Sequence, residues 1–261
     1  MSGHSSVLTD SATMFRRSLL RLRRYPSMTL MLIGMPVVFL LLFVYVFGGT
    51  MGSGISGGGR GAYLDYVAPG VLVMAIAGAA QGTAITVAMD STEGIIARFR
   101  TMAIARSSVL TGHVLGSLVQ AMLCVAGALG VAMLIGYRPA AGPLDWIAIA
   151  GMVLLVALAL TWLSVGLGLS ASTVESASNT PMLLVLLPFV SSGFVPTDSL
   201  PSGLRWFAEN QPFTSIIETL RGLLAGSPDG GDVLLAVGWC LTIGLVSAAW
   251  SIRLFTRPRT R

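Results

Sequence analysis

Long apolar runs, each free of acidic and basic side chains, dominate the chain. Six windows of at least 20 residues contain no Asp, Glu, Lys or Arg. A charged side chain is costly at the centre of a bilayer, and about 20 apolar residues cross the hydrocarbon as a helix. In lipid the backbone must satisfy its own hydrogen bonds, so the runs indicate helices and not strands. We therefore predict an all-α membrane protein with six transmembrane helices, at about 27–47, 65–88, 109–135, 146–169, 178–197 and 233–252.

The basic residues flank these runs unevenly, and all 16 of them are Arg. Most lie in the segment before the first run, in the loop after the second run and at the C-terminus. The other connections hold only Arg60, Arg138, Arg205 and Arg221. Cytoplasmic loops carry an excess of basic residues, so the Arg-rich side is predicted to be cytoplasmic. An even number of spans then places both termini in the cytoplasm, with one transmembrane domain over residues 1–261.

Composition supports a lipid environment. Hydrophobic residues make up 54% of the chain and charged residues 10%, whereas soluble domains carry about 25% charged residues. The Arg residues sit at the ends of apolar runs and are not gathered on one folded face, which argues against a nucleic-acid partner. The two cysteines, Cys124 and Cys240, lie inside apolar runs and are interpreted as small buried side chains.

The segment 10–25 is predicted to be an amphipathic helix that lies on an anionic membrane surface. Three apolar side chains recur at helical spacing, and Arg residues occupy most of the remaining positions. The alternative is a charged tail that only sets topology. The residues that define this helix are Phe15, Arg16, Arg17, Leu19 and Leu22.

The segment 90–106 has the pattern of a short cytoplasmic helix. Asp90 and Glu93 are spaced as a capping box, which predicts a helix start at Asp90. An apolar ridge follows at helical spacing, with Arg residues elsewhere. Two interpretations are open: an interfacial helix that merely joins two spans, or a docking helix for a cytoplasmic partner. The residues that define the docking interpretation are Asp90, Glu93, Gly94, Ile95, Arg98, Phe99 and Arg100.

Two segments that do not span the membrane are predicted on the external side. Residues 48–61 are rich in Gly and predict a flexible loop. Within 198–232, one short helix is predicted around Leu204 and Phe207, and another from Pro212 to about Gly226. The second helix is too short to span, so we predict a re-entrant or surface-lying helix. Its apolar stripe consists of Phe213, Ile216, Ile217, Leu220, Leu223 and Leu224.

The fifth run contains Pro181, Pro188 and Pro196. Proline kinks or breaks a membrane helix, and a broken helix that lines a path is the alternative to ordinary kinking. Little catalytic chemistry is available elsewhere. The acidic residues lie outside the predicted spans or at their edges, and His113, the only histidine in a span, is interpreted as structural. A Walker A loop needs a Lys, which the chain lacks, so the sequence predicts no ATPase, catalytic or metal site.

The whole layout resembles the permease subunits of type-2 ATP-binding-cassette exporters. Within these exporters it resembles the daunorubicin-resistance-like group. The resemblance covers nearly the whole chain and depends on the order and spacing of three segments. These are YLDYVAPGVLV at 63–73, DSTEGIIARFRTMAIARSSVLTGH at 90–113 and GFVPTDSLPSGLRWFAENQPFTSIIETLRGLLAG at 193–226. No single segment among them is diagnostic alone.

The resemblance implies a role for each region. The segment 10–25 would be the interfacial connecting helix, and the segment around Glu93–Arg100 the coupling helix that docks on an ATPase subunit. The segment 200–226 would form the external re-entrant helices. Two permeases and two ATPase subunits would work together in a bacterial cytoplasmic membrane, with ATP and Mg²⁺ bound by the partner and no cofactor in this chain. The substrate would be a small hydrophobic or amphipathic compound, such as a drug or antibiotic.

Three rival functions stay open at this stage. An exporter of lipid or polysaccharide would use the same layout, although the low aromatic content, 8%, disfavours a sugar path. A membrane-embedded enzyme would need ionisable residues that converge within the spans. An anchoring protein without transport is the third.

Overall fold

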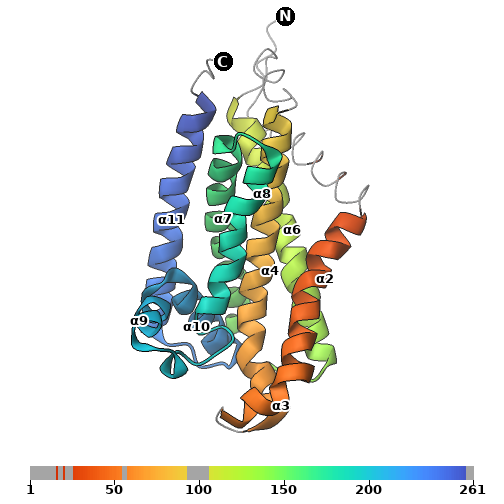
Figure 1. The fold of residues 1–261 in the computed structure, drawn as a ribbon, viewed down its shortest axis with the longest axis vertical. Helices are drawn as coiled ribbons and strands as arrows, with labels where there is room; N and C mark the ends of the chain where they lie inside the picture. Colours follow the sequence, from red (N-terminus) through yellow and green to blue (C-terminus); the bar gives the residue numbers. More distant parts are fainter. Residues whose placement is uncertain (1–15, 17–19, 21–25, 55–57, 93–105, 257–261) are drawn as a thin grey trace, which may run out of the picture.

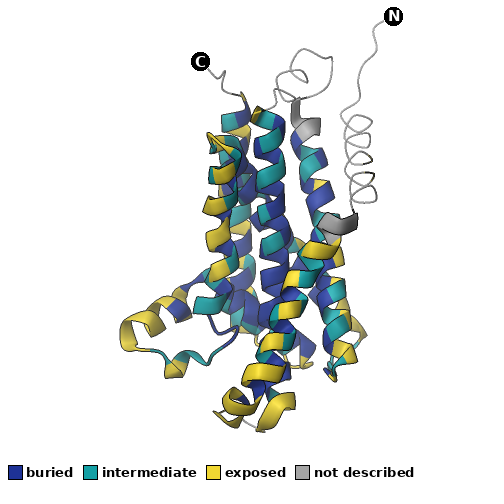
Figure 2. Cartoon of the chain, turned by 45° about the vertical axis from the view of Figure 1, so that its right-hand side comes forward, coloured by how far each residue is buried: buried dark blue, intermediate teal, exposed yellow. Residues whose placement is uncertain are grey.

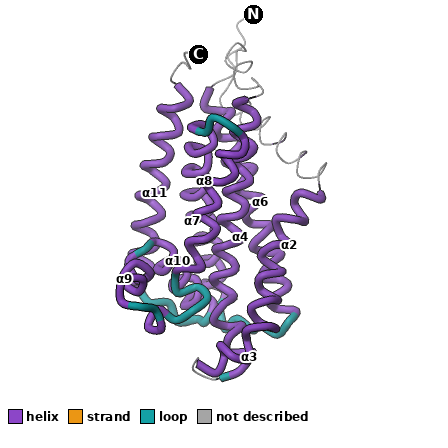
Figure 3. The backbone as a smooth tube through the Cα atoms, viewed as in Figure 1, coloured by secondary structure: helices purple, strands orange, loops and turns teal. Residues whose placement is uncertain are grey.

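We describe the protein from a computed structural model, in which residues 16, 20, 26–54, 58–92 and 106–256 are placed. Every regular element among these residues is helical (Figure 3). The helices are α2 (Pro26–Leu42), η1 (Phe43–Phe47), α3 (Gly48–Met51), η2 (Gly52–Gly54), α4 (Gly59–Thr92), α6 (Arg106–Leu134), α7 (Pro143–Ser170), α8 (Val174–Leu186), η3 (Leu187–Val190), η4 (Thr197–Ser199), α9 (Ser202–Asn210), α10 (Pro212–Leu224) and α11 (Gly230–Thr256).

Five helices are long and apolar enough to cross a membrane. They run over Leu30–Gly54, Gly59–Thr92, Leu110–Leu134, Pro143–Ser170 and Gly230–Thr256. The remaining apolar run forms a shorter helix, Val174–Val190, and the chain leaves helical structure after Val190. Pro188 converts the end of α8 into a 3₁₀ turn, so the predicted span at 178–197 is helical only as far as Val190. Six crossings and the orientation of the chain stay predictions.

The long helix α4 forms the centre of the bundle (Figure 1). It packs against α2, α6, α7 and α8, and its residues from Val67 to Ala77 are all buried. Small residues make up much of this stretch, which lets neighbouring helices approach closely as in other membrane bundles. In Figure 2 the central helix is coloured mostly as buried, and the outer helices carry many residues coloured as exposed.

Backbone contact between α4 and α7 requires glycine. A Cβ atom built on Gly168 of α7 would lie 2.5 Å from the carbonyl oxygen of Ala84 and 3.1 Å from the Cβ of Val87. Both atoms belong to α4, so any larger residue would separate the two helices. By contrast, a Cβ atom on Gly78 of α4 would meet nothing within 4 Å.

Local capping defines the starts of α7 and α8. The Asp145 carboxylate accepts a hydrogen bond from the Gly142 N–H at 2.8 Å, and Pro143 occupies the first turn of α7. Thr173 caps α8 by accepting from the Ser176 N–H at 3.2 Å. These caps fix short connections at the two ends of the bundle.

The Gly-rich segment after the first run is helical over much of its length, which corrects the expectation of a loop over 48–61. The π-helical turn η1 continues α2, and α3 and η2 carry the helix to Gly54. A Cβ atom at Gly52 would lie 2.2 Å from the carbonyl oxygen of Gly59. The helix therefore folds tightly back to α4, and small residues are needed because the two backbones touch.

The helices α9 and α10 lie at the end of the bundle opposite to the junction of α4 and α6 (Figure 1). This end holds most of the polar structure described next. At the other end, α4 ends at Thr92 and α6 begins at Arg106.

Candidate functional site

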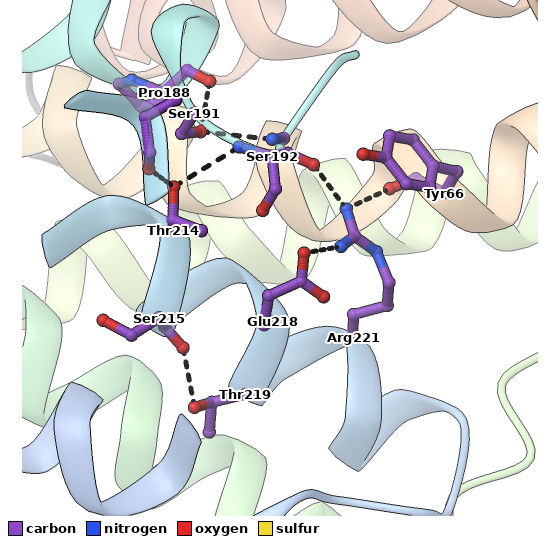
Figure 4. A network of polar contacts seen from close by, with 11 residues as sticks. Tyr66, Pro188, Ser191, Ser192, Thr214, Ser215, Glu218, Thr219 and Arg221 are labelled. Carbon is purple, nitrogen blue, oxygen red and sulfur yellow. Dashed lines mark hydrogen bonds and ion pairs between the residues drawn. The ribbon is translucent and has the colours of Figure 1, made fainter. Parts of the chain in front are cut away.

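A polar network surrounds α10 and connects three separate parts of the chain (Figure 4). It begins where α8 is broken. The side-chain amide of Gln211 donates to the carbonyl oxygens of Val190 at 2.6 Å and Leu187 at 3.3 Å. A helix end leaves carbonyl groups without partners, and an unsatisfied group is costly in an apolar medium. Gln211 therefore stabilises the C-terminal end of the α8–η3 helix, which stops short of the predicted span.

The short loop after η3 contacts α4 directly. A Cβ atom on Gly70 of α4 would lie 2.7 Å from the carbonyl oxygen of Gly193, so the two backbones leave no room for a side chain. Tyr63, also on α4, donates its hydroxyl to the carbonyl oxygen of Phe194 at 3.2 Å. Phe194 is buried. Irregular backbone is thus enclosed by protein at this end of the bundle, which is the condition under which non-helical chain occurs near lipid.

Arg221 of α10 joins this loop to α4. Its Nη2 atom donates to the carbonyl oxygen of Ser192 at 2.8 Å and to that of Tyr66 at 3.1 Å. Its Nη1 atom pairs with the Glu218 carboxylate at 2.5 Å. The guanidinium also lies 4.1 Å from the centre of the Tyr66 ring, a cation–π geometry. One side chain therefore fixes α10, the loop and α4 relative to one another.

The network has spare hydrogen-bonding capacity. Among the described residues, four buried side-chain atoms have no hydrogen-bond partner, and three of them belong to this network. They are Ser192 Oγ, Gln211 Oε1 and Arg221 Nε. Buried polar groups are ordinarily paired, so these atoms have the capacity to bind water or a polar group of a substrate. The set offers donors and acceptors for binding, without an activated nucleophile.

A connection between α6 and α7 covers the far side of α10. The Ala140 N–H donates to the carbonyl oxygen of Leu224 at 2.9 Å. Burial, and to a smaller extent the carboxylate of Asp65, raises the pKa of Tyr137 to about 12 against an opposing effect of the Arg221 guanidinium. The helix α10 is followed by Gly226 with φ +71°, the left-handed conformation that ends many helices.

Aromatic rings pack on the opposite flank of the same loop. Phe189 and Phe194 stack with ring centres 4.6 Å apart, and Phe43 lies 4.7 Å from Phe194. Phe39 contacts Phe189 edge-on at 5.5 Å. Because Phe43 begins the π-helical turn η1, this cluster holds the distorted part of the first span against the end of the α8–η3 helix.

The residues predicted for the external helices fall into two groups. The helix α10 begins at Pro212, the position that the sequence indicates, and Phe213, Ile216 and Leu220 are all buried. The helix α10 packs on α11, α7 and α4, and the choice between a re-entrant and a surface-lying helix stays a prediction. In α9, Leu204 and Phe207 are 43% and 41% exposed. That helix ends at Asn210, and its exposed ion pairs join Arg205 to Asp198 and Glu209.

The segment predicted to dock a partner lies mostly outside the described residues. This applies to Glu93, Gly94, Ile95, Arg98, Phe99 and Arg100. Asp90 is described, and it corrects one expectation: it lies in the last turn of α4, which continues to Thr92, so it does not start a separate helix. The capping-box spacing was misleading because the same residue types also occur inside a helix, and here α4 continues through Asp90.

Asp90 instead pairs with His113 of α6. The distance from His113 Nε2 to Asp90 Oδ2 is 3.2 Å, and the two side chains are 14% and 7% exposed. His113 was expected to be structural, and its partner could not be inferred because the two residues are far apart in the sequence.

The amphipathic surface helix over 10–25 is also largely outside the described residues. This includes Phe15, Arg17, Leu19 and Leu22. Arg16 is described as helical and exposed. The proposed contact of this segment with lipid stays a prediction.

Sequence reasoning passed over Arg221 and Gln211, the two residues that organise the network around α10. A signal was present for Arg221, since it is a charged residue three positions after Glu218 on a helix that is otherwise strongly apolar. Gln211 gave no signal beyond its place before Pro212. The described residues contain no group of three or more His, Cys, Asp or Glu side chains arranged to hold a metal ion.

Residues 10–225 match the ABC-2 type transporter family. The chain belongs to this family. Among its curated relatives is the daunorubicin resistance ABC transporter permease protein DrrB1 of Streptomyces coeruleorubidus, which is 26% identical over 96% of this chain and 87% of its own length. The probable doxorubicin resistance ABC transporter permease protein DrrC of Mycobacterium tuberculosis is 26% identical over 63% of this chain and 60% of its own length. ABC transporter G family member 20 of Dictyostelium discoideum is 27% identical over 67% of this chain and 24% of its own length.

The family match accounts for the general plan of this ABC-2 chain. The bacterial relatives are named as ABC permeases, which are transport components that lack an ATPase of their own. The match covers the segment from 90 to 113 and the polar network around α10. The family match therefore includes residues from both ends of the described bundle, and it supports a permease with several membrane-spanning helices.

Proposed function

We propose that this chain is the membrane permease of an exporter that moves a hydrophobic or amphipathic organic compound out of the cell. The observation that carries the proposal is similarity along almost the full length of a relative named for daunorubicin resistance. The residues agree with a transport role, because the bundle combines apolar spans with a buried polar network at one end. Neither feature requires bond-breaking chemistry in this chain.

The energy for transport would come from a separate ATPase subunit. The chain has no Lys, and a Walker A loop uses a Lys to hold the nucleotide phosphates. We propose that ATP and Mg²⁺ bind the partner, and that the partner docks on the segment 90–106, around Glu93–Arg100. The two nucleotide states of the ATPase would have to contact this segment differently, since equal contacts shift no equilibrium. A second permease subunit, identical or different, would complete the transport path.

We further propose six crossings with both ends in the cytoplasm. The helix Val174–Val190 is about 25 Å long at 1.5 Å per residue, which is short of the roughly 30 Å hydrocarbon thickness. The loop after Val190 and the helix α10 would complete that crossing at membrane depth. Hydrogen bonds from Gln211 to the last carbonyl oxygen of η3 and from Arg221 to a carbonyl oxygen of the loop stabilise this arrangement in a low-dielectric setting.

The proposal is tested by co-expressing the tagged chain with each ABC ATPase subunit encoded in the same genome. The expected result is co-purification of the ATPase and reduced accumulation of daunorubicin in the cells. The control replaces the Walker A Lys of the ATPase, which must abolish efflux while co-purification persists. Co-purification without daunorubicin efflux would redirect the cargo towards lipid or polysaccharide. Failure of any ABC ATPase to co-purify would refute the mechanism itself.

A further inference from the structure

The Asp90–His113 pair lies at the opposite end of the bundle from the α10 network. It joins the last turn of α4 to the second turn of α6, at 3.2 Å between Nε2 and Oδ2. Both side chains are largely enclosed. A carboxylate and an imidazole at this depth are costly unless they are paired, and ionisable groups in membrane helices are uncommon outside functional positions. The pair therefore needs an explanation beyond helix packing.

A small apolar cluster lies beside the pair. Its members come from four helices, α4, α6, α7 and α11. Val87 is three residues before Asp90 and Leu110 is three residues before His113, so the pair and the cluster share helix faces on α4 and α6. The cluster consists of Val87, Leu110, Val114, Val165 and Phe255. A movement of the pair would consequently reach α7 and α11 through direct side-chain contact.

A second polar connection between α4 and α6 lies further into the bundle, one helical turn beyond His113 along α6. Thr83 donates to the hydroxyl of Ser117 at 2.6 Å, and Ser117 lies 3.1 Å from the Thr161 hydroxyl of α7. Ser117 follows His113 by four residues on the same face of α6. The two helices are thus held together at two levels, of which only the outer level contains ionisable groups.

From these contacts we infer that Asp90 and His113 are positioning residues for energy coupling, an inference that rests on the proposed function. The pair makes the ends of α4 and α6 move as one body. A force that the ATPase applies between Thr92 and Arg106 then shifts both helices and the four-helix cluster together, instead of separating the two helix ends. A packed core changes between two discrete arrangements and does not deform continuously. A rigid connection between α4 and α6 is therefore needed to pass the movement of the helix ends to the packed cluster.

The first test measures whether the pair holds the helix ends together, and it needs neither ATPase nor substrate. Spin labels are placed at the exposed residues Thr92 of α4 and Leu115 of α6, with Cys124 and Cys240 replaced by Ala. The distance distribution between the labels should be narrow in the unaltered pair. In His113→Leu it should be about twofold broader, because one partner of a buried pair has been removed.

Two further variants separate the pair from general packing. His113→Gln keeps a nitrogen donor near the position of Nε2, so its distribution should stay narrow. Ser117→Ala removes only the inner hydroxyl contact, so its distribution should also stay narrow. A broad distribution in His113→Gln or in Ser117→Ala, or a narrow one in His113→Leu, would overturn the inference.

The second test measures coupling in liposomes that contain the chain and its ATPase. His113→Leu should bind the ATPase normally and hydrolyse ATP, but move about tenfold less daunorubicin per ATP, the size expected of one coupling contact. His113→Gln should recover the ratio. An unchanged ratio in His113→Leu would refute the coupling role. If the unaltered complex moves no daunorubicin with ATP, the proposed substrate fails, and the distance measurements together with ATPase stimulation still decide the role of the pair.

Discussion

Replacing Arg221 by Met should destabilise the end of the bundle at which α10 lies. Arg221 is the only side chain among the described residues that donates to both the loop after η3 and the backbone of α4. Met has a similar length and no charge, so the substitution removes these bonds without a large change in volume. The carbonyl oxygens of Tyr66 and Ser192 would then lose their donor in a partly buried site.

The magnitude follows from the contacts. A hydrogen bond from a charged donor contributes about 1.5–3 kcal/mol, and Arg221 makes two to carbonyl oxygens. The stacking on Tyr66 adds about 0.5–2 kcal/mol. Against this, Arg221 Nε is buried without a partner, which costs about 1–3 kcal/mol. The side chain is 19% exposed, so solvent weakens the ion pair with Glu218 and it is left out of the sum. The expected loss is about 3 kcal/mol, or roughly 6–12 °C in melting temperature.

The assay is thermal unfolding of the purified chain in detergent, followed by a tryptophan signal or by aggregation. Arg205→Met of α9 is the matched control, because Arg205 forms two short ion pairs that are exposed to solvent. Exposed ion pairs contribute little, so this variant should melt within about 2 °C of the unaltered chain. If both variants melt alike, or if Arg221→Met leaves the melting temperature unchanged, the assigned role of the Arg221 contacts is incorrect.

Three other predictions test separate parts of the structure. Gly168→Ala should lower the melting temperature by several degrees, because the new Cβ atom would lie 2.5 Å from the backbone of α4. The Cβ atom of Gly78→Ala would meet nothing within 4 Å, so this variant should melt at the same or a higher temperature. Equal losses in the two variants would contradict the packing argument. Burial raises the pKa of Tyr137 to about 12, so the unfolded chain ionises this phenol first and stability should fall as the pH rises from about 10 to 12. Tyr137→Phe should weaken that fall in a melting series, and an identical pH profile would count against it. Phe99→Asp should leave membrane insertion intact and abolish efflux of daunorubicin, and normal efflux from a well-expressed variant would argue against docking at this residue.

Several features could be predicted because they depend on local sequence. Charge-free length marks the long helices, since the cost of a charge in lipid acts on each residue independently. The start of α10 at Pro212 also follows from a local rule about the first turn of a helix. The same kind of reasoning placed the start of a helix at Asp90 wrongly, because a capping pattern inside a long apolar helix competes with continued helical hydrogen bonding.

Other features depended on contacts between residues that are distant in the chain. The sequence by itself determined that most of the chain is apolar helix and that α10 has one apolar face. Only the tertiary structure decided that this face packs into the bundle, that Gly70 meets Gly193, and that Asp90 meets His113. The physical reason is that lipid is as apolar as the helix surfaces, so hydrophobicity does not choose which faces meet. Close packing of small residues and the pairing of buried polar groups make that choice, and both require the folded arrangement of all the helices.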